Sequence, residues 1–352
     1  MHEAVAYGFV LEIALALLAA GSQDIALGRL LTSVEDADAV ADNTGADPLS
    51  DGVRSVDAAA RLAFVVELTG GDATAVGGVD LLARMVSMAQ DDGRFVEGGS
   101  DRFTSLEGHA FALLALDTAG QVPAEALVQG LLAAQCPDGS FPYVYEPDEG
   151  TSCTGRVEVT GLVLQALAAL DLGSDDAARS AVDWLRAQQQ DDGSFLQLDN
   201  GMFPGPRPPV DITGPAVLGL NAVGEPTGDA VVWLTAQQND DGGLHSADRV
   251  SNAGSTALAL PALAGTTYQH SARFVARQAV PVPPSSPTPN PTATPTPSRP
   301  PSPPTTVSTA PEILPITGID SADVLLSGVA LVAAGSVLLA ASRPRRRGRH
   351  AA

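Results

Sequence analysis

The chain contains no lysine, so its 19 basic residues are all arginines, against 41 acidic residues. Five of these arginines lie in the last ten residues, so the remainder is more acidic than the net charge of −22 indicates. An acidic body repels nucleic-acid phosphates and anionic lipids. We therefore expect no nucleic-acid partner, and instead expect cations, neutral molecules or basic surfaces. The acidity could also serve only solubility.

Aromatic residues are scarce as well, at 4% of the chain. Strands favour aromatic and β-branched residues, whereas small aliphatic side chains let helices approach closely. The sequence therefore predicts an all-α protein. Its 352 residues suffice for one large domain or two ordinary ones.

Residues 314–352 carry three features in order: the motif Leu314-Pro315-Ile316-Thr317-Gly318, an apolar run over 322–341, and an arginine-rich tail. A helix of that length spans roughly 30 Å, the thickness of a bilayer core, and arginines hold one end in the cytoplasm. The arrangement resembles the sorting signal of sortase substrates in bacteria with a Gram-positive type of wall. An ordinary membrane anchor with a chance match to the motif is the alternative.

The resemblance implies that a sortase cysteine attacks the carbonyl of Thr317, that Gly318 leaves, and that Thr317 is passed to an amine of peptidoglycan. Pro315 favours an extended backbone suited to an enzyme groove. The implied location is secreted and covalently wall-anchored, with a transmembrane helix only in the precursor. Sortase and peptidoglycan are the implied partners.

Residues 279–313 are rich in proline, serine and threonine and predict an extended, disordered stalk. At the opposite end, Met1-His2-Glu3 lacks the basic start of a signal peptide, and Glu12 interrupts the apolar run 9–20. We expect this run to be the first helix of the domain, with the true signal missing from the start. An unusual signal peptide ending near Ala20 is the alternative.

The body, residues 1–278, is a sixfold repeat. Apolar helix-like runs end at glycines spaced 41 to 53 residues apart, namely Gly21, Gly70, Gly120, Gly173, Gly224 and Gly265. Second amphipathic stretches follow, and four of them end in an Asp-Gly turn with an apolar residue two places on: Phe95, Phe141, Phe195 and Leu244. Each unit is therefore predicted to be a helical hairpin, and about six could form a closed ring or an open solenoid.

The Gln-(one or two residues)-Asp-Gly turns, followed by Ser-Phe in two cases, resemble prenyltransferase and squalene-cyclase repeats. So do the Trp-Leu-(two residues)-Gln segments that begin at Trp184 and Trp233. The resemblance implies the α/α toroid. It does not fix an activity, because this toroid serves several unrelated functions.

The motifs of those enzymes are absent. The segment Arg156-Val157-Glu158-Val159-Thr160 stands where cyclases carry clustered aspartates, and the chain is poor in carbocation-stabilising aromatics. No Asp, Cys and His set suits zinc, and the Cys-Gly-Glu-Gln of thioester domains is missing. We therefore predict no catalytic residue, no metal and no cofactor, and the sequence argues against an enzyme.

Acidic or amide residues open most of the expected inner helices: Asp57, Glu107, Glu158, Asp211 and Asn252. Parallel inner helices would gather them around one mouth of the ring as a binding rim for a cationic or sugar-like ligand or a metal ion. Carboxylates at helix starts also act as simple caps. His109 is expected to be a satisfied polar residue rather than a catalyst.

Cys136 and Cys153 flank one loop between repeats, and a disulfide is expected outside the cell; a free pair or a metal site are the alternatives.

Three hypotheses for function remain: a wall-displayed binding or adhesion module with an unknown small-molecule or surface ligand, an extracellular cyclase- or transferase-like enzyme, and a passive spacer of the envelope.

Overall fold

The computed structural model describes residues 2–21, 25–36, 40, 55–97, 104–145, 153–196, 209–245 and 249–269. The predicted stalk, the sorting motif and the apolar run 322–341 lie outside the described residues. Within the described residues, helices dominate and only isolated β-bridges occur. No helix in this part is long and apolar enough to cross a membrane.

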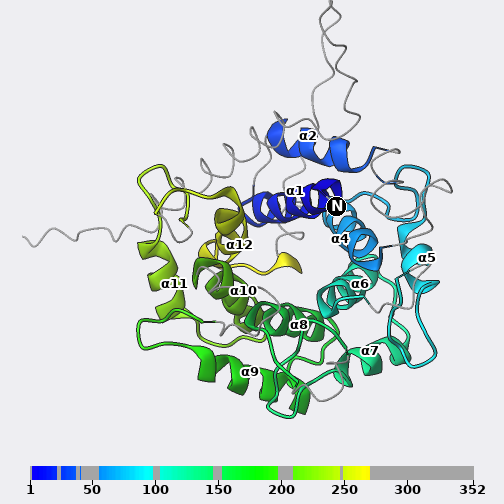
Figure 1. The fold of residues 1–352 in the computed structure, drawn as a ribbon. Coiled ribbons are helices and arrows are strands. Elements are labelled where there is room, and N and C mark those ends of the chain that lie inside the picture. Colours follow the sequence, from blue (N-terminus) through cyan, green and yellow to red (C-terminus); the bar gives the residue numbers. More distant parts are fainter. Residues whose placement is uncertain are drawn as a thin grey trace, which may run out of the picture.

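Six helices line the centre of the ring (Figure 1). They are α1 (His2–Ala19), α4 (Val56–Leu68), α6 (Leu106–Thr118), α8 (Val157–Ala169), α10 (Pro209–Ala222) and α12 (Ala253–Leu263). Each packs against the next, and α12 packs against α1. This last contact closes the ring, so the described body is a toroid and the open solenoid is wrong.

Within the described residues, five further helices lie outside the inner six (Figure 1). They are α2 (Ile25–Val34), α5 (Leu81–Val86), α7 (Glu125–Leu132), α9 (Asp176–Gln188) and α11 (Gly228–Ala236). Each of them contacts the inner helix that precedes it in the chain. The hairpin of an inner and an outer helix is therefore the repeating unit, as the glycine spacing predicts.

The predicted helix stops are confirmed at five of the six glycines, which have positive φ. The exception is Gly173, because the left-handed residue after α8 is Asp171, with φ of 60°. Asp171 lies two residues earlier than the predicted stop. This accounts for the two extra residues in that repeat, since Glu158 then stands at the same distance from its helix stop as Glu107 and Asp211 do from theirs.

The Asp-Gly turns bind each outer helix to the next inner helix. The apolar residues that follow them, Phe95, Phe141, Phe195 and Leu244, are all fully buried. In three repeats their backbone N–H donates to a threonine hydroxyl of the next inner helix: Phe141 to Thr160 (3.0 Å), Phe195 to Thr213 (2.9 Å) and Leu244 to Thr256 (2.9 Å). Turn and inner helix are therefore held in a fixed register.

Glycines allow the inner helices to pack closely. A Cβ at Gly161 on α8 would lie 2.4 Å from the carbonyl oxygen of Pro215 on α10, and a Cβ at Gly214 would lie 2.4 Å from that of Leu258 on α12. The scarcity of large side chains is thus a requirement of the ring.

Candidate functional site

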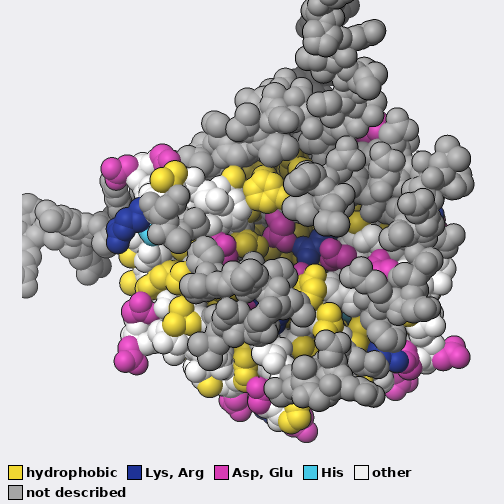
Figure 2. Space-filling model, viewed as in Figure 1, with side chains coloured by type: hydrophobic (Ala, Val, Ile, Leu, Met, Phe, Trp, Pro, Cys, Tyr) yellow, Lys and Arg dark blue, Asp and Glu magenta, His cyan; other side chains and the backbone are white. Residues whose placement is uncertain are grey.

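A cavity of about 240 Å³ lies at the centre of the ring. Its walls come from all six inner helices and from Tyr268, which follows α12. Acidic, basic and apolar side chains meet in the central hollow of the space-filling view (Figure 2). The cavity is the strongest candidate for a functional site because it brings charged groups together inside an apolar ring.

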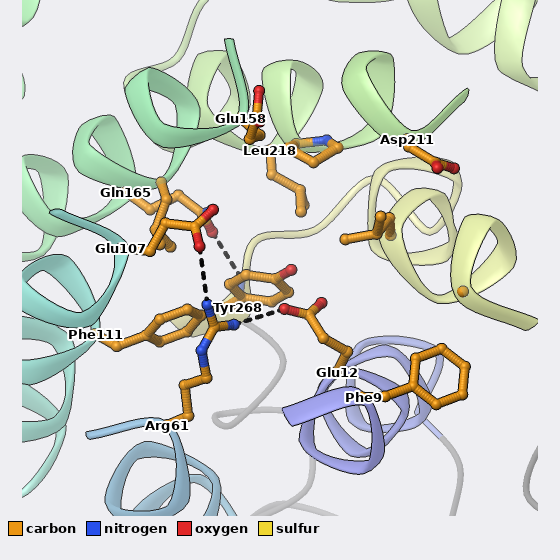
Figure 3. Close-up of a pocket in the computed structure, with 14 residues that line it drawn as sticks. Phe9, Glu12, Arg61, Glu107, Phe111, Glu158, Gln165, Asp211, Leu218 and Tyr268 are labelled. Carbon is orange, nitrogen blue, oxygen red and sulfur yellow. Dashed lines mark hydrogen bonds and ion pairs between the residues drawn. The ribbon is translucent and has the colours of Figure 1, made fainter. Parts of the chain in front are cut away.

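The guanidinium of Arg61 is the centre of one half of the cavity (Figure 3). It binds carboxylates from three helices: Glu12 of α1 at 2.7 Å, Asp57 of α4 at 2.9 Å and Glu107 of α6 at 3.2 Å. Its Cζ also lies 4.3 Å from the centre of the Phe111 ring. Arg61 is 9% exposed, so a cation is already held here between carboxylates and an aromatic face.

One guanidinium does not balance three carboxylates. Burial raises the pKa of Glu107 to about 7, although the charge of Arg61 acts in the opposite direction. Burial also raises the pKa of Glu12. The Oε2 atom of Glu12 is buried and has no hydrogen-bond partner within the described residues. This half of the cavity therefore holds excess negative charge, part of which is neutralised by protons near neutral pH.

The other half of the cavity carries two more carboxylates beside apolar walls. Glu158 of α8 is 8% exposed and forms an ion pair with Arg156, which is 2% exposed. Asp211 stands in the first turn of α10. Neither is among the ion-pair partners of Arg61. The apolar lining of the cavity includes Phe9, Leu162, Pro215, Leu218 and Leu258.

Tyr268 closes the cavity on the side where the inner helices end. It is 5% exposed, its ring stacks on Phe111 with centroids 6.3 Å apart, and its backbone N–H donates to Oε1 of Gln165 at 3.2 Å. The next residue, Gln269, donates to Oδ2 of Asp117 in the last turn of α6 at 2.9 Å. The segment after α12 therefore crosses the ring and forms a floor, which is visible in Figure 1.

Four of the five predicted rim residues lie at or in the cavity, at the starts of parallel inner helices. Glu107, Glu158 and Asp211 line it, and Asp57 binds Arg61 beside it. Asn252 does not line it: its side chain accepts from the N–H of Ser255 and caps α12. Gly254 takes the lining position there, because α12 begins at Ala253 and Gly254 is its second residue, as Glu158 is of α8.

The two cysteines form a disulfide, as predicted, with their Cα atoms 5.6 Å apart. It joins the turn after α7 to the segment before α8. His109 is fully buried, and its Nδ1 forms a hydrogen bond with the hydroxyl of Tyr145. Burial lowers the pKa of His109 to about 3, so the imidazole is neutral. In its repeat, His109 occupies the position that Thr160, Thr213 and Thr256 occupy in the later repeats, where the threonine accepts a hydrogen bond from the turn. The role of His109 is therefore structural.

Comparison with known proteins yields similarity of fold alone. No protein-family profile matches the chain, and no curated protein matches it. The chain is similar to the solved structure of ent-copalyl diphosphate synthase from Streptomyces platensis, with 22% identity and a TM-score of 0.47. That match covers 74% of this chain and 50% of the synthase, so the chain spans about half the synthase's length.

A second similar structure is the type II terpene cyclase MstE from Scytonema, with 14% identity and a TM-score of 0.35. This match covers 78% of this chain and 70% of the cyclase. Both TM-scores are below 0.5, so the assignment of the toroid depends on the helix contacts described above. Matches of this quality do not assign the substrate of either enzyme to this cavity.

Sequence reasoning missed Arg61, Glu12 and Tyr268. The two charged residues could have been found, because each is the single charge inside an otherwise apolar stretch of an inner helix. Such a charge is stable only with a partner from a neighbouring element. Tyr268 had no such signal, because it follows the last repeat. Within the described residues, no group of three or more His, Cys, Asp or Glu could hold a metal ion.

Proposed function

We propose that the toroid is a binding module displayed on the bacterial cell wall, with its small ligand held in the central cavity. The main support is the cavity itself, which has polar groups inside apolar walls and a closed floor. Cavities of this composition are the usual sites of small ligands. A passive spacer needs no such cavity, since a ring centre filled with leucine and valine would be more stable than one holding buried carboxylates.

Filling the cavity tests this function. The Leu162→Trp variant puts a large side chain into the cavity wall, whereas Leu196→Trp places the same side chain at a position that is 38% exposed and away from the ring centre. The full-length chain and both variants would be screened against a metabolite library by thermal shift. Ligands that stabilise the wild type and Leu196→Trp, but not Leu162→Trp, would support the cavity as the site. A library without any such ligand would refute the proposal.

Display on the wall depends on the sorting signal. Residues 314–318 match the sortase pattern, and the following apolar run and basic tail stand in the expected order. Protein released from the wall by a muramidase should end at Thr317, joined to a peptidoglycan amine. Mass spectrometry of the C-terminal peptide would show this, and wall-associated protein that retains Gly318 would contradict it.

A cyclase-like enzyme is the second candidate. Its support is Glu107, a buried acid whose pKa of about 7 would let it donate a proton to an alkene in a cavity with aromatic rings. The guanidinium of Arg61 in the same cavity would repel a carbocation. Incubation with linear polyprenyl diphosphates, followed by gas chromatography with mass spectrometry, would decide. A cyclised product that disappears in Glu107→Gln would favour the enzyme over the binding module.

A further inference from the structure

We propose that the ligand of the central cavity is a small organic ammonium ion with a short apolar substituent. This inference rests on the proposed binding function and names its ligand class. Four features of the cavity support it: the balance of charge, the separation of its two halves, the aromatic faces and the size.

The charges at the cavity favour a cation. Five carboxylates lie in or beside it, on Glu12, Asp57, Glu107, Glu158 and Asp211. Among the residues that the structure describes, two guanidiniums form ion pairs with these carboxylates, those of Arg61 and Arg156. An anionic ligand would add to the excess negative charge in a poorly solvated place, and a neutral one would leave it unchanged. A monovalent cation reduces it.

The position of Arg61 indicates which half of the cavity is open to the ligand cation. Arg61 occupies the half formed by α1, α4 and α6, where it already binds three carboxylates. Across from it, Glu158, Leu218 and Asp211 lie on the opposite side of the cavity (Figure 3), and Leu162 and Leu258 also line the cavity. An ammonium group can interact with these carboxylates while an attached alkyl group packs on the leucines. The buried Oε2 of Glu12 provides a further acceptor in the first half.

The aromatic residues favour an organic cation over a bare ion. The Phe111 ring carries the Arg61 guanidinium on its face at 4.3 Å. Phe9 and Tyr268 present further rings to the cavity. Aromatic faces attract poorly hydrated ammonium ions, whereas metal ions prefer several oxygen ligands in a fixed geometry. The described residues offer no group of three or more His, Cys, Asp or Glu for a metal.

The size of the cavity limits the ligand. Its volume of about 240 Å³ is below the range of roughly 300–1,000 Å³ that holds drug-sized molecules. The Tyr268 floor prevents the ligand from extending through the ring. A long prenyl chain or an oligosaccharide would not fit inside, so the cavity accepts only a small ligand.

Choline and two isosteres of different charge test the ligand class. Isothermal titration of the full-length chain at pH 7.5 would use choline, the neutral 3,3-dimethyl-1-butanol and the anionic 3,3-dimethylbutanoate. We expect choline to bind at least about tenfold more tightly than the alcohol, and the carboxylate not to bind. Repeating the titration in buffers of different ionisation enthalpy should show proton release, since a cation lowers the raised pKa of Glu107.

Two matched variants locate the interaction. Asp211→Asn removes a carboxylate in the first turn of α10 and should weaken choline about tenfold while leaving the alcohol unchanged. Asp229→Asn makes the same change in the first turn of the outer helix α11, where the side chain is exposed, and should have no effect. Unchanged choline binding in Asp211→Asn, or equal binding of choline and the alcohol, would overturn the proposal.

The remaining outcomes separate the ligand class from the function. If none of the three probes binds while another ligand still depends on an unfilled cavity, the ammonium class is wrong and the binding function stands. Tight binding of Ca²⁺ alone that excludes choline would assign a metal instead and would also overturn the class. If no ligand is sensitive to Leu162→Trp, the binding function itself fails.

Discussion

Single charged residues decide the character of the ring centre. Arg61 is the only basic residue of α4 and is buried among apolar neighbours. Removing its side chain would leave the carboxylates of Glu12 and Glu107 buried without a counter-ion, which is far more costly than losing a surface ion pair. Arg61 therefore stabilises the ring only as part of a group of charges from three helices.

The protonation of Glu107 makes stability depend on pH. Its pKa is about 7 in the folded protein and 4.5 in the reference state, so folding favours the protonated form. This contribution is complete below about pH 4.5 and is lost as the pH rises through about 7. We expect the melting temperature of the wild type to fall relative to Glu107→Gln between pH 5 and pH 8, as measured by calorimetry.

The comparison with Glu107→Gln also isolates this group from its neighbours. The pKa of His109 is lowered to about 3, so the contribution of His109 to protein stability has the opposite pH dependence. That contribution is lost as the pH falls below the ordinary histidine pKa of 6.5. Glu12, with its raised pKa, is present in both proteins as well. A difference in melting temperature that stays constant from pH 5 to pH 8 would show that Glu107 is ionised throughout.

At the scale of elements, inner helices need glycine where they touch. The Gly161→Ala variant places a methyl group 2.4 Å from the backbone oxygen of Pro215, which must move with α10. We expect a loss of about 1–3 kcal/mol in the free energy of unfolding. Urea denaturation would measure it.

The outer helices provide the control for this prediction. A Cβ at Gly28 in α2 would meet no atom within 4 Å, so Gly28→Ala should stabilise the protein by about 0.5–1 kcal/mol through its effect on the unfolded chain. Equal effects of the two substitutions would mean that the contact between α8 and α10 is looser than described.

The floor segment sets the depth of the cavity. In Tyr268→Ala the ring that packs on Phe111 is removed and the cavity extends toward the ends of the inner helices. We expect longer alkylammonium ions, such as hexylammonium, to bind this variant better than the wild type by titration calorimetry. Loss of buried aromatic surface should also cost about 3–5 kcal/mol of stability. Unchanged preference for chain length would show that Tyr268 does not limit the ligand.

The repeating elements were predictable, but their closure was not. Helix stops and turns follow from glycine chemistry, so the hairpins can be located from positions such as Gly120 and Gly139. The rotation between successive hairpins depends on side-chain contacts between helices, such as Gly161 against Pro215, which the spacing does not reveal. The repeat also explains why the rim was predicted in part. Residues at equivalent positions of successive inner helices come together at one end of the ring, whereas the floor segment belongs to no repeat.

At the scale of the whole molecule, the disulfide links neighbouring repeats. Cys136 and Cys153 enclose a loop between α7 and α8, and a cross-link of this length stabilises a fold by about 3 kcal/mol. We expect the double variant Cys136→Ser/Cys153→Ser to melt about 6–12 °C lower than the wild type. Calorimetry with dithiothreitol gives the control, because the reductant should lower the melting temperature of the wild type and leave the variant unchanged.

The path of the chain beyond the floor has a mechanical consequence. The chain leaves the described toroid at Gln269, whose side chain is bonded to Asp117, and its sequence then runs through the proline-rich segment to residues 314–318. If Thr317 is the attachment point, a load between cell and environment is borne first by the residues under the cavity and only afterwards by a ring helix. Under that attachment, the hydrogen bonds of Tyr268 to Gln165 and of Gln269 to Asp117 would be the described contacts nearest to the applied force, so displacement of the cavity floor would accompany the load.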